Sequence, residues 1–422
     1  MSDTTEQDRP AGEPPTHRSR HRVRRTITVV VAVVLAVLVM TGILRQCSED
    51  VVEHSTLGTF NVLPDPLPDG QPGQLIRSER LLGAPDGAVA WRVLYHSTDL
   101  DGNPIGVSGI VIAPDRPAPD GGWPIVSWAH PTTGAYGKCA PSEMEDPFAL
   151  VAGSHELIEA GYVIAATDYS GMGADGPPAY LIGETEGNNV LDAARAAREI
   201  PETHAGTDLL LWGHSQGGQS ALFAAEQAPS YAPELKLHGV AVAAPAAELG
   251  QLLDDHEDDA SGVTIGSYAF DAMEKVYGAT DPDVRLDEVL TPEGIAVVPQ
   301  IAPQCLLGDI SELHDVAAPA VGKFFSVDPS TVEPWKTILA ENTAGTKPID
   351  VPILVTQGDD DTLVLPTSTA NFVASLCARD ERVMYRTFPG VSHGLAGERS
   401  IPTLLPWLHD ALEGTASQDE CS

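Results

Sequence analysis

A serine in a turn framed by glycines is the first residue in this sequence that could carry chemistry. Gly213-His214-Ser215-Gln216-Gly217 follows an apolar run at residues 209–212 and precedes a helix-like stretch. A tight turn between a strand and a helix exposes the serine hydroxyl, and the helix N-terminus offers N–H groups to a developing oxyanion. The two glycines remove side chains that would collide with the neighbouring strand and helix. The motif therefore predicts that Ser215 is a nucleophile rather than part of a structural turn.

A nucleophilic serine needs a base and an acid that orients the base, here in the chain order serine, acid, histidine. His393 lies in a loop after the last strand-like run, and we predict that it is the base. A preceding strand-like run opens into Asp359, Asp360 and Asp361. The G-x-x-D-x-x-V spacing selects Asp361 as the acid, with Asp360 as the alternative. We expect Asp359 to belong to a solvated acidic turn.

The oxyanion of an acyl-transfer intermediate needs two backbone donors, and one of them normally comes from the loop after the third strand. That loop contains His130-Pro131-Thr132-Thr133. Proline has no N–H, so Pro131 cannot donate. We therefore predict that the N–H groups of Thr132 and Gln216 form the oxyanion hole, and Thr133 remains a neighbouring alternative.

Strand-like and helix-like segments alternate through the part of the chain that contains these residues. The strand-like runs are residues 88–95, 105–112, 123–128, 162–167, 209–212, 239–244, 353–356 and 383–388. The helix-like stretches are residues 147–160, 188–200, 216–227, 365–378 and 401–412. Continuous apolar runs are typical of parallel strands buried on both faces, and the alternation predicts a doubly wound, mostly parallel α/β sheet.

One long interval interrupts this alternation. Residues 247–347, between the sixth and seventh strand-like runs, contain no clear strand. We predict a mostly helical cap insertion there, covering one end of the sheet within a catalytic domain that spans residues 88–415. The run Asp254-Asp255-His256-Glu257-Asp258-Asp259 falls inside it, and we interpret it as a solvated face, because it lacks the glycine and spacing of a calcium loop.

The first 87 residues differ in composition from the rest of the chain. Residues 1–25 are polar and predict a disordered cytoplasmic tail, and residues 46–87 predict an extended lead-in. Residues 26–44 form an uncharged run that is about 28 Å long as a helix, close to the bilayer core of about 30 Å. Arginines before it and acidic residues after it predict an inside N-terminus and an extracytoplasmic body.

A cleaved signal peptide is the alternative to this single-pass anchor. Signal peptides have an apolar region of about 7–15 residues and a cleavage site of small residues. The run at residues 26–44 is longer, and Ile43-Leu44-Arg45-Gln46 offers no such site. We therefore favour a membrane-anchored protein, which would instead be secreted if the segment is cleaved.

Charge and composition limit what kind of protein this is. The 422 residues carry a formal net charge of -36, and the part after residue 45 contains 17 basic and 56 acidic residues. A protein body with this excess of acidic residues repels the phosphate backbone of DNA or RNA, which excludes nucleic acid as a partner. A hydrophobic content of 42% excludes global disorder. Nothing in the sequence points to a particular protein partner.

Five cysteines fit an extracytoplasmic body. Cys47 adjoins the apolar run, whereas Cys139, Cys305, Cys377 and Cys421 lie in the body. Outside the cytoplasm, four body cysteines predict two disulfides, for which three pairings are possible.

The motifs together resemble the α/β-hydrolase superfamily and, within it, the secretory lipase family of fungal lipase A-type enzymes and their actinobacterial relatives. The resemblance spans roughly residues 60–415. It is carried by Tyr95-His96-Ser97, His130-Pro131-Thr132-Thr133-Gly134, Asp168-Tyr169-Ser170-Gly171-Met172-Gly173, Gly213-His214-Ser215-Gln216-Gly217-Gly218 and Glu341-Asn342-Thr343-Ala344-Gly345. It implies hydrolysis of carboxylic esters, often lipid-like acyl esters, beneath a helical cap. It also implies disulfides between Cys139 and Cys305 and between Cys377 and Cys421.

These observations predict a serine carboxylic ester hydrolase that acts on lipid-like or small acyl esters outside the cytoplasm and needs no cofactor or metal. An acyltransferase or peptidase with the same triad is the first alternative, because the acyl-enzyme is common to all three reactions. A non-catalytic, membrane-tethered surface protein with this fold is the second. The intact triad argues against that second alternative.

Overall fold

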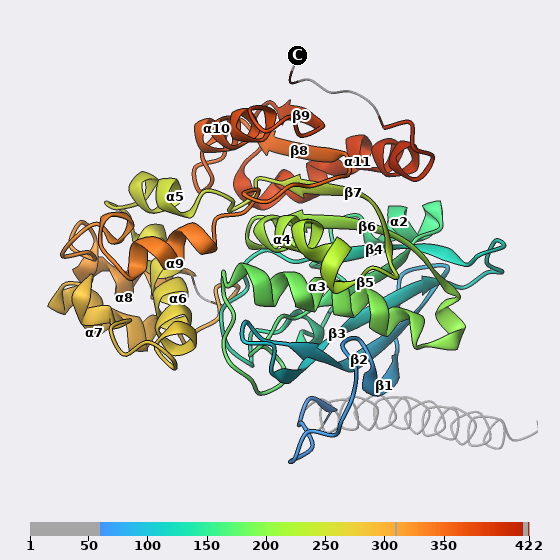
Figure 1. The fold of residues 1–422 in the computed structure, drawn as a ribbon, viewed down its shortest axis with the longest axis horizontal. Helices are drawn as coiled ribbons and strands as arrows, with labels where there is room; N and C mark the ends of the chain where they lie inside the picture. The colour runs from blue at the N-terminus through green and yellow to red at the C-terminus, as the bar shows by residue number, and fades with distance from the viewer. Residues whose placement is uncertain (1–59, 309, 417–420, 422) are drawn as a thin grey trace, which may run out of the picture. The chain divides into compact units, whose positions relative to one another are not determined.

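One mixed β-sheet runs through the computed structural model of the chain, which describes residues 60–308, 310–416 and 421 (Figure 1). The strand order is β1-β2-β3-β5-β4-β6-β7-β8-β9. Neighbours are antiparallel from β1 to β5 and parallel from β5 to β9. The bounds are β1 Leu75–Leu81, β2 Ala88–Thr98, β3 Pro104–Pro114, β4 Trp123–Ala129, β5 Val163–Thr167, β6 Ala205–His214, β7 Lys236–Ala243, β8 Ile353–Gly358 and β9 Val383–Phe388.

Helices cover both faces of this sheet. One face packs against α3 (Gly183–Arg198), α4 (Gln216–Tyr231) and α10 (Pro366–Cys377), and the other against α2 (Ser154–Ala160) and α11 (Ala396–Leu412). Successive side chains of a strand point to opposite faces, so Leu211 enters one hydrophobic core and its neighbour Trp212 the other. Burial on both faces is the reason that the central strands are continuous apolar runs.

All eight strands expected from the sequence are present, and the sheet gains one more at its edge. β1 pairs antiparallel with β2 and lies inside the region predicted to be an extended lead-in. Its side chains are half-buried or exposed, so β1 has no continuous apolar run that would reveal it. Because β1 precedes all the predicted strands, the sixth and seventh predicted strands carry the labels β7 and β8.

The segment between β7 and β8 is helical in its described residues and forms a lobe beside the sheet, at the left of Figure 1. We call this lobe the insertion. Its hydrophobic core, in which Tyr268, Phe270 and Trp335 are fully buried, is separate from the two cores on the faces of the sheet but also includes residues 179–182 from the segment before α3. Its α-helices are α5 Leu249–Asp255, α6 Ala260–Tyr277, α7 Pro292–Ile301, α8 Ile310–Ala317 and α9 Trp335–Glu341.

Two disulfides cross-link the chain. Cys139, in the loop after β4, bonds to Cys305 in the insertion, and Cys377, at the end of α10, bonds to Cys421. These are the two pairings that the family resemblance implied.

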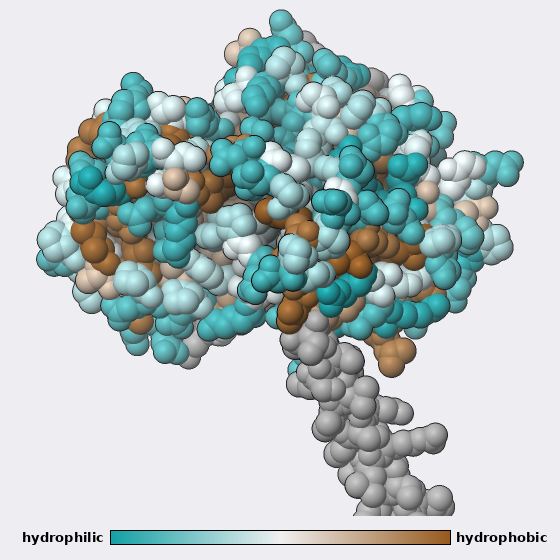
Figure 2. Space-filling view, turned by 60° about the horizontal axis from the view of Figure 1, so that its bottom comes forward, coloured by the Kyte–Doolittle hydropathy of each residue, from teal (hydrophilic) through white to brown (hydrophobic). Residues whose placement is uncertain are grey.

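The molecular surface in Figure 2 is mostly hydrophilic, with hydrophobic side chains in small separate groups, as expected for a chain with a net charge of -36. The predicted cytoplasmic tail and apolar run, residues 1–25 and 26–44, lie outside the described residues. Among the residues described, none of the helices combines the length and apolar character needed to span a bilayer.

Candidate active site

The turn between β6 and α4 holds Ser215 in a conformation that L-amino acids rarely adopt, with φ 57° and ψ -119°. The glycines on either side have steric reasons to be there. A Cβ at Gly213 would lie 2.0 Å from the Gly217 oxygen, and one at Gly217 would lie 1.9 Å from the Ala129 oxygen in β4. Strand, turn and helix therefore pack so closely that only glycine fits beside the serine, as the motif predicted.

Ser215, His393 and Asp361 form a continuous hydrogen-bonded series. Ser215 Oγ lies 2.8 Å from His393 Nε2, and His393 Nδ1 lies 2.8 Å from Asp361 Oδ2. An ionised carboxylate only accepts, so Nδ1 carries the proton and Nε2 is left to accept the serine proton. The three residues follow β6, β9 and β8, whose parallel carboxyl ends meet at one edge of the sheet.

Burial distinguishes the three adjacent aspartates. Asp361 is buried, whereas Asp359 and Asp360 are exposed. The Asp361 carboxylate accepts the N–H groups of Leu363 and Val364. Burial raises the pKa of Asp361, but the His393 bond and these N–H donors outweigh burial and hold that pKa below its ordinary value. Asp361 is therefore ionised and able to orient His393.

Gln357 is a partner of the acid that sequence reasoning missed. Its side-chain amide donates to Asp361 Oδ2 at 3.1 Å and to the Val364 carbonyl at 3.0 Å, and its oxygen accepts the Thr369 hydroxyl. Gln357 stands at the end of β8, where the sequence carries no motif around it. Only the folded chain shows that this amide is fully buried and aimed at the acid.

His214, next to Ser215 in the turn, packs against His393. Its ring centroid lies 5.0 Å from that of His393. Burial, with the nearby His393, lowers the pKa of His214 to about 3, so the ring is neutral at physiological pH. His214 thus fills space beside His393 without adding a positive charge there.

The two residues predicted to supply the oxyanion donors both line the cavity that contains Ser215. Gln216 is the first residue of α4, so its N–H has no intrahelical acceptor. The Thr132 N–H makes no hydrogen bond within the described part of the chain. Thr133 is fully buried, and its hydroxyl and carbonyl bond to Cys139 and Leu306. Of the two threonines, Thr132 is the one that lines the cavity.

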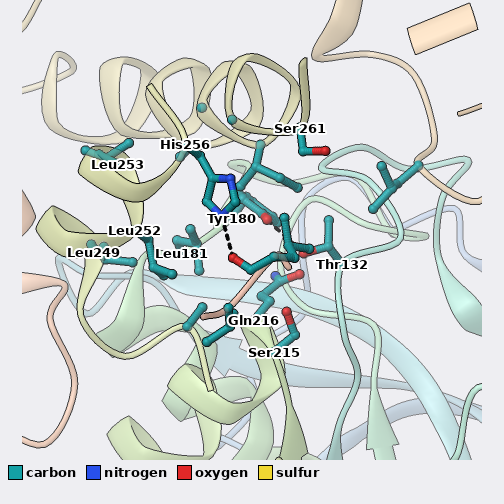
Figure 3. Close-up of a pocket in the computed structure, with 18 of the residues that line it drawn as sticks. Thr132, Tyr180, Leu181, Ser215, Gln216, Leu249, Leu252, Leu253, His256 and Ser261 are labelled. Atoms are coloured by element: carbon teal, nitrogen blue, oxygen red, sulfur yellow. Dashed lines mark hydrogen bonds between the residues drawn. The ribbon is translucent and has the colours of Figure 1, made fainter. Parts of the chain in front are cut away.

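An apolar cavity of about 430 Å³ extends from Ser215 into the insertion. Figure 3 shows Ser215 and Gln216 at one side of it and Leu249, Leu252 and Leu253 from α5 at another. Side chains of α6 and of the loop after α8 complete the wall, among them Ile265, Ala269, Phe270, Met273, Phe324 and Phe325. A reacting ester at Ser215 would thus have its apolar part among insertion side chains.

The acidic run in the insertion is only partly the solvated face that the sequence predicted. Asp254, Glu257 and Asp258 are exposed. His256 (labelled in Figure 3), in contrast, is buried. Its ring nitrogens bond to Asp259 and to the Leu363 carbonyl at 2.6 Å each. This ring links the insertion directly to the loop that carries Asp361. The described residues contain no cluster of three or more His, Cys, Asp or Glu side chains that could hold a metal.

Comparisons with known proteins agree with this geometry. The family model named "Secretory lipase" matches residues 150–420. Lipase A of Arthroderma benhamiae is 24% identical over 393 residues, covering 85% of this chain and 80% of that protein. Secreted triacylglycerol lipase LIP4 of Malassezia globosa is 26% identical, covering 85% and 81%. A Mycobacterium tuberculosis protein named a probable inactive lipase is 30% identical, but covers only 42% of this chain and 43% of its own.

Solved structures with similar folds include a lipase and an esterase. Candida antarctica lipase A in its closed state has a TM-score of 0.67 at 19% identity, covering 82% of this chain and 84% of that one. The rice cell wall degrading esterase LipA from Xanthomonas oryzae has a TM-score of 0.68 at 21% identity, covering 82% and 100%. At such identities the likeness establishes the fold.

Proposed function

This chain belongs to the secretory lipase family, with the α/β-hydrolase fold, and we propose that it is a serine carboxylic ester hydrolase that uses Ser215, His393 and Asp361. The observation that carries the proposal is the unbroken series of 2.8 Å contacts from Ser215 to Asp361 at the wall of an apolar cavity. Nucleophile, base and orienting acid in this geometry are the parts that acyl transfer requires.

The reaction follows from the positions of the protons. Ser215 Oγ attacks the ester carbonyl while His393 Nε2 takes its proton, and the oxyanion that forms accepts the N–H groups of Thr132 and Gln216. The intermediate collapses, the C–O bond breaks, and His393 returns the proton to the leaving alcohol. A water, deprotonated by His393, then attacks the acyl-enzyme. The bond from the acyl carbon to Ser215 Oγ breaks as His393 returns the proton to Oγ, which releases the acid and restores the free enzyme. Asp361 remains ionised and stabilises the imidazolium throughout.

The cavity supports an acyl ester of lipid-like character as the substrate. Its insertion wall is built from leucine, isoleucine, phenylalanine and methionine side chains, which gain from contact with a hydrocarbon chain. We infer that the insertion is a cap, and that the acyl group enters the cavity beneath it while the leaving alcohol faces the opening. The names of the fungal relatives, which include a triacylglycerol lipase, agree with this substrate class.

We place this activity outside the cytoplasm. The family description and the name of the Malassezia relative both refer to secretion, and two disulfides fit an oxidising compartment. We further propose that residues 26–44 anchor the protein in the membrane with residues 1–25 inside. Fractionation of expressing cells tests the anchor, because an anchored protein pellets with membranes and a cleaved one appears in the medium.

Hydrolysis of p-nitrophenyl esters from acetyl to palmitoyl by the purified full-length chain, with S215A as the control, tests the activity. We expect turnover that disappears in S215A and that favours acyl chains long enough to reach the insertion. Product analysis with an added alcohol separates hydrolysis from acyl transfer, because a transferase yields the new ester. A folded wild-type protein that hydrolyses none of these esters, and is not labelled by a fluorophosphonate, would exclude the proposal.

A further inference from the structure

Both oxyanion residues bond through their side chains to a single segment, residues 180–186, which leads into α3. The Thr132 hydroxyl lies 2.8 Å from the Tyr180 hydroxyl, and the Gln216 amide donates to Glu186 at 2.6 Å. Thr132, Tyr180, Leu181 and Gln216 all line the cavity and are labelled in Figure 3. The segment therefore contacts both halves of a site whose two donors come from separate loops.

Glu186 is deeply embedded beside the nucleophile turn. Its side chain is fully buried, and one carboxyl oxygen accepts the Gln216 amide and, at 3.1 Å, the Leu181 N–H. Its other oxygen lies within hydrogen-bond distance of the Ser220 hydroxyl, one turn further along α4. No basic side chain forms an ion pair with Glu186 within the described residues. The titratable groups that face it are the buried phenols of Tyr169 and Tyr180.

The bonding pattern fits a neutral Glu186. Ser220 Oγ is close to both the Glu186 carboxyl and, at 3.0 Å, the Gln216 carbonyl. A hydroxyl has one proton, so Ser220 either divides it between these two acceptors or, if Glu186 is protonated, donates it to the Gln216 carbonyl and accepts a full bond from the Glu186 carboxyl. Burial favours the protonated form, since it outweighs the hydrogen bonds and raises the pKa of Glu186 to about 8.

Leu181 shows that the backbone of the segment is held in place. Its φ of 57° is unfavourable for a residue with a branched side chain, so neighbouring groups must retain it. Its N–H donates to Glu186, and its carbonyl accepts the Gln219 amide of α4 at 3.3 Å. The segment and the start of α4 thus restrain one another around the nucleophile turn.

We propose that Glu186 and Tyr180 are positioning residues of the oxyanion hole, Glu186 by holding Gln216 and Tyr180 by holding Thr132. This inference rests on the proposed function. The side-chain bonds fix the two residues whose N–H groups must point at the oxyanion, and preorganised donors stabilise the transition state more than the bound ester. Their loss should therefore lower kcat more than it raises KM.

The role of Glu186 is tested with E186L and Q216L. Each variant removes the hydrogen bond between the Gln216 amide and Glu186 and keeps every backbone N–H. A misplacement of about 1 Å can cost about 100-fold in rate, so we expect kcat to fall about 10- to 100-fold with KM within about threefold. The double variant should be no worse than the more impaired single variant, because both remove one interaction. E226L, which removes a buried glutamate from the far part of α4, is the matched control and should keep its kcat.

The role of Tyr180 is tested with Y180F and T132V, each of which removes one of the two hydroxyls that bond to each other. Tyr268, whose ring lies 5.6 Å from that of Tyr180 and whose hydroxyl bonds to the Gln304 carbonyl, supplies the control Y268F. We expect Y180F and T132V to lower kcat severalfold and non-additively, and Y268F to leave it unchanged. These conservative variants keep the proposal testable if E186L does not fold.

A pH profile adds a readout that a merely structural role would not move. Glutamine at position 186 reproduces the hydrogen bonds of the neutral acid, so E186Q should keep kcat at pH 7 within about twofold. Ionised Glu186 would still accept the Gln216 amide, but its buried negative charge would oppose the charge that develops on the oxyanion. Wild-type kcat should therefore decline above about pH 8, and E186Q should lack that decline.

The outcomes separate this inference from the proposed function. Serine-dependent turnover in the wild type together with unchanged kcat in E186L, Q216L and Y180F would overturn the positioning role alone. Strictly additive losses in the Glu186–Gln216 pair would overturn it as well. A wild-type protein without serine-dependent turnover would overturn both proposals.

Discussion

At the residue scale, burial distinguishes Asp361 from two chemically identical neighbours, and we propose for this reason that Asp361 is the acid that orients His393. Asp361 points inward and accepts two backbone N–H groups and the Gln357 amide, whereas Asp360 faces solvent. A carboxylate held by several donors keeps its charge and its direction, which an exposed one does not. Orientation of His393 therefore depends on the fold of the loop after β8 as much as on the identity of the acid.

Exchange of Asp361 for asparagine should lower kcat by about 10⁴-fold, the effect expected when a triad aspartate is lost and the histidine tautomer changes. The neighbouring D360N should stay within about twofold of wild type, because its side chain is exposed. Steady-state kinetics on one p-nitrophenyl ester compare the two. A large loss in D360N with little loss in D361N would assign the acid to Asp360 instead.

Gly217 tests the steric argument for the nucleophile turn. In G217A the new Cβ would meet the Ala129 oxygen at 1.9 Å, so β4 or α4 must move, and overpacking of this kind typically costs about 1–3 kcal/mol or more. Gly250 in α5 has no atom within 4 Å of an added Cβ, and G250A should gain up to about 1 kcal/mol from helix propensity. Thermal melting of both variants makes the comparison. Equal melting temperatures would refute the close packing at Gly217.

At the element scale, the loop after β4 is shared between the sheet and the insertion. It carries Thr132, its Thr133 carbonyl accepts the Leu306 N–H, and Cys139 bonds covalently to Cys305. Each contact joins the proposed oxyanion loop to the helical lobe that walls the cavity. The insertion thus walls the cavity beside Ser215 and also holds the loop that we propose supplies one oxyanion donor.

The two disulfides should have different effects on catalysis. C139S/C305S removes the link between the oxyanion loop and the insertion, so we expect a lower melting temperature and a reduced kcat. C377S/C421S removes a disulfide between residues that are 44 positions apart in the chain. In the chain-entropy account such a disulfide contributes on the order of 4 kcal/mol to the free energy of unfolding. Neither cysteine lines the cavity. The melting temperature of this variant should fall while kcat/KM stays unchanged. A similar loss of activity in both pairs would show that general stability, rather than the loop, is responsible.

At the scale of the whole molecule, the chain is acidic on its surface and contains acidic groups in its interior. Burial raises the pKa of Glu186 to about 8 and of Asp192 to about 6, and it raises those of Asp168 and Glu226 as well. Each of these groups binds its proton more tightly in the folded than in the unfolded chain. Their contribution to stability is therefore present at low pH and is lost as the pH rises through the folded pKa values.

The melting temperature should consequently fall between about pH 5 and pH 8, and E186Q should weaken this dependence because one proton no longer leaves the interior. Full titration of one such group changes the free energy of unfolding by about 1.4 kcal/mol per pH unit. E159Q, at an exposed position in α2, is the control and should follow the wild-type profile. Parallel profiles for E186Q and wild type would show that Glu186 keeps one protonation state throughout this range.

The sequence by itself determined the features that depend on neighbouring residues along the chain. Apolar runs long enough to be buried on both faces identified eight strands, and close-packed glycines marked the turn at Ser215. Loops directly after the last two such runs contain Asp361 and His393. These signals are local because strand period, turn geometry and the order of parallel strands are written within a few residues.

The tertiary structure alone decided the features that depend on what packs against a residue. β1 is an edge strand with half-exposed side chains, so its pairing with β2 has no periodic signal. Gln357 and Glu186 look like ordinary polar residues of a strand and a helix, and only burial turns them into partners of Asp361 and Gln216. His256 similarly stands in a run that reads as solvated until the fold places it against Leu363. Burial is set by elements distant in the chain, and therefore these roles follow from the fold and not from any stretch of sequence.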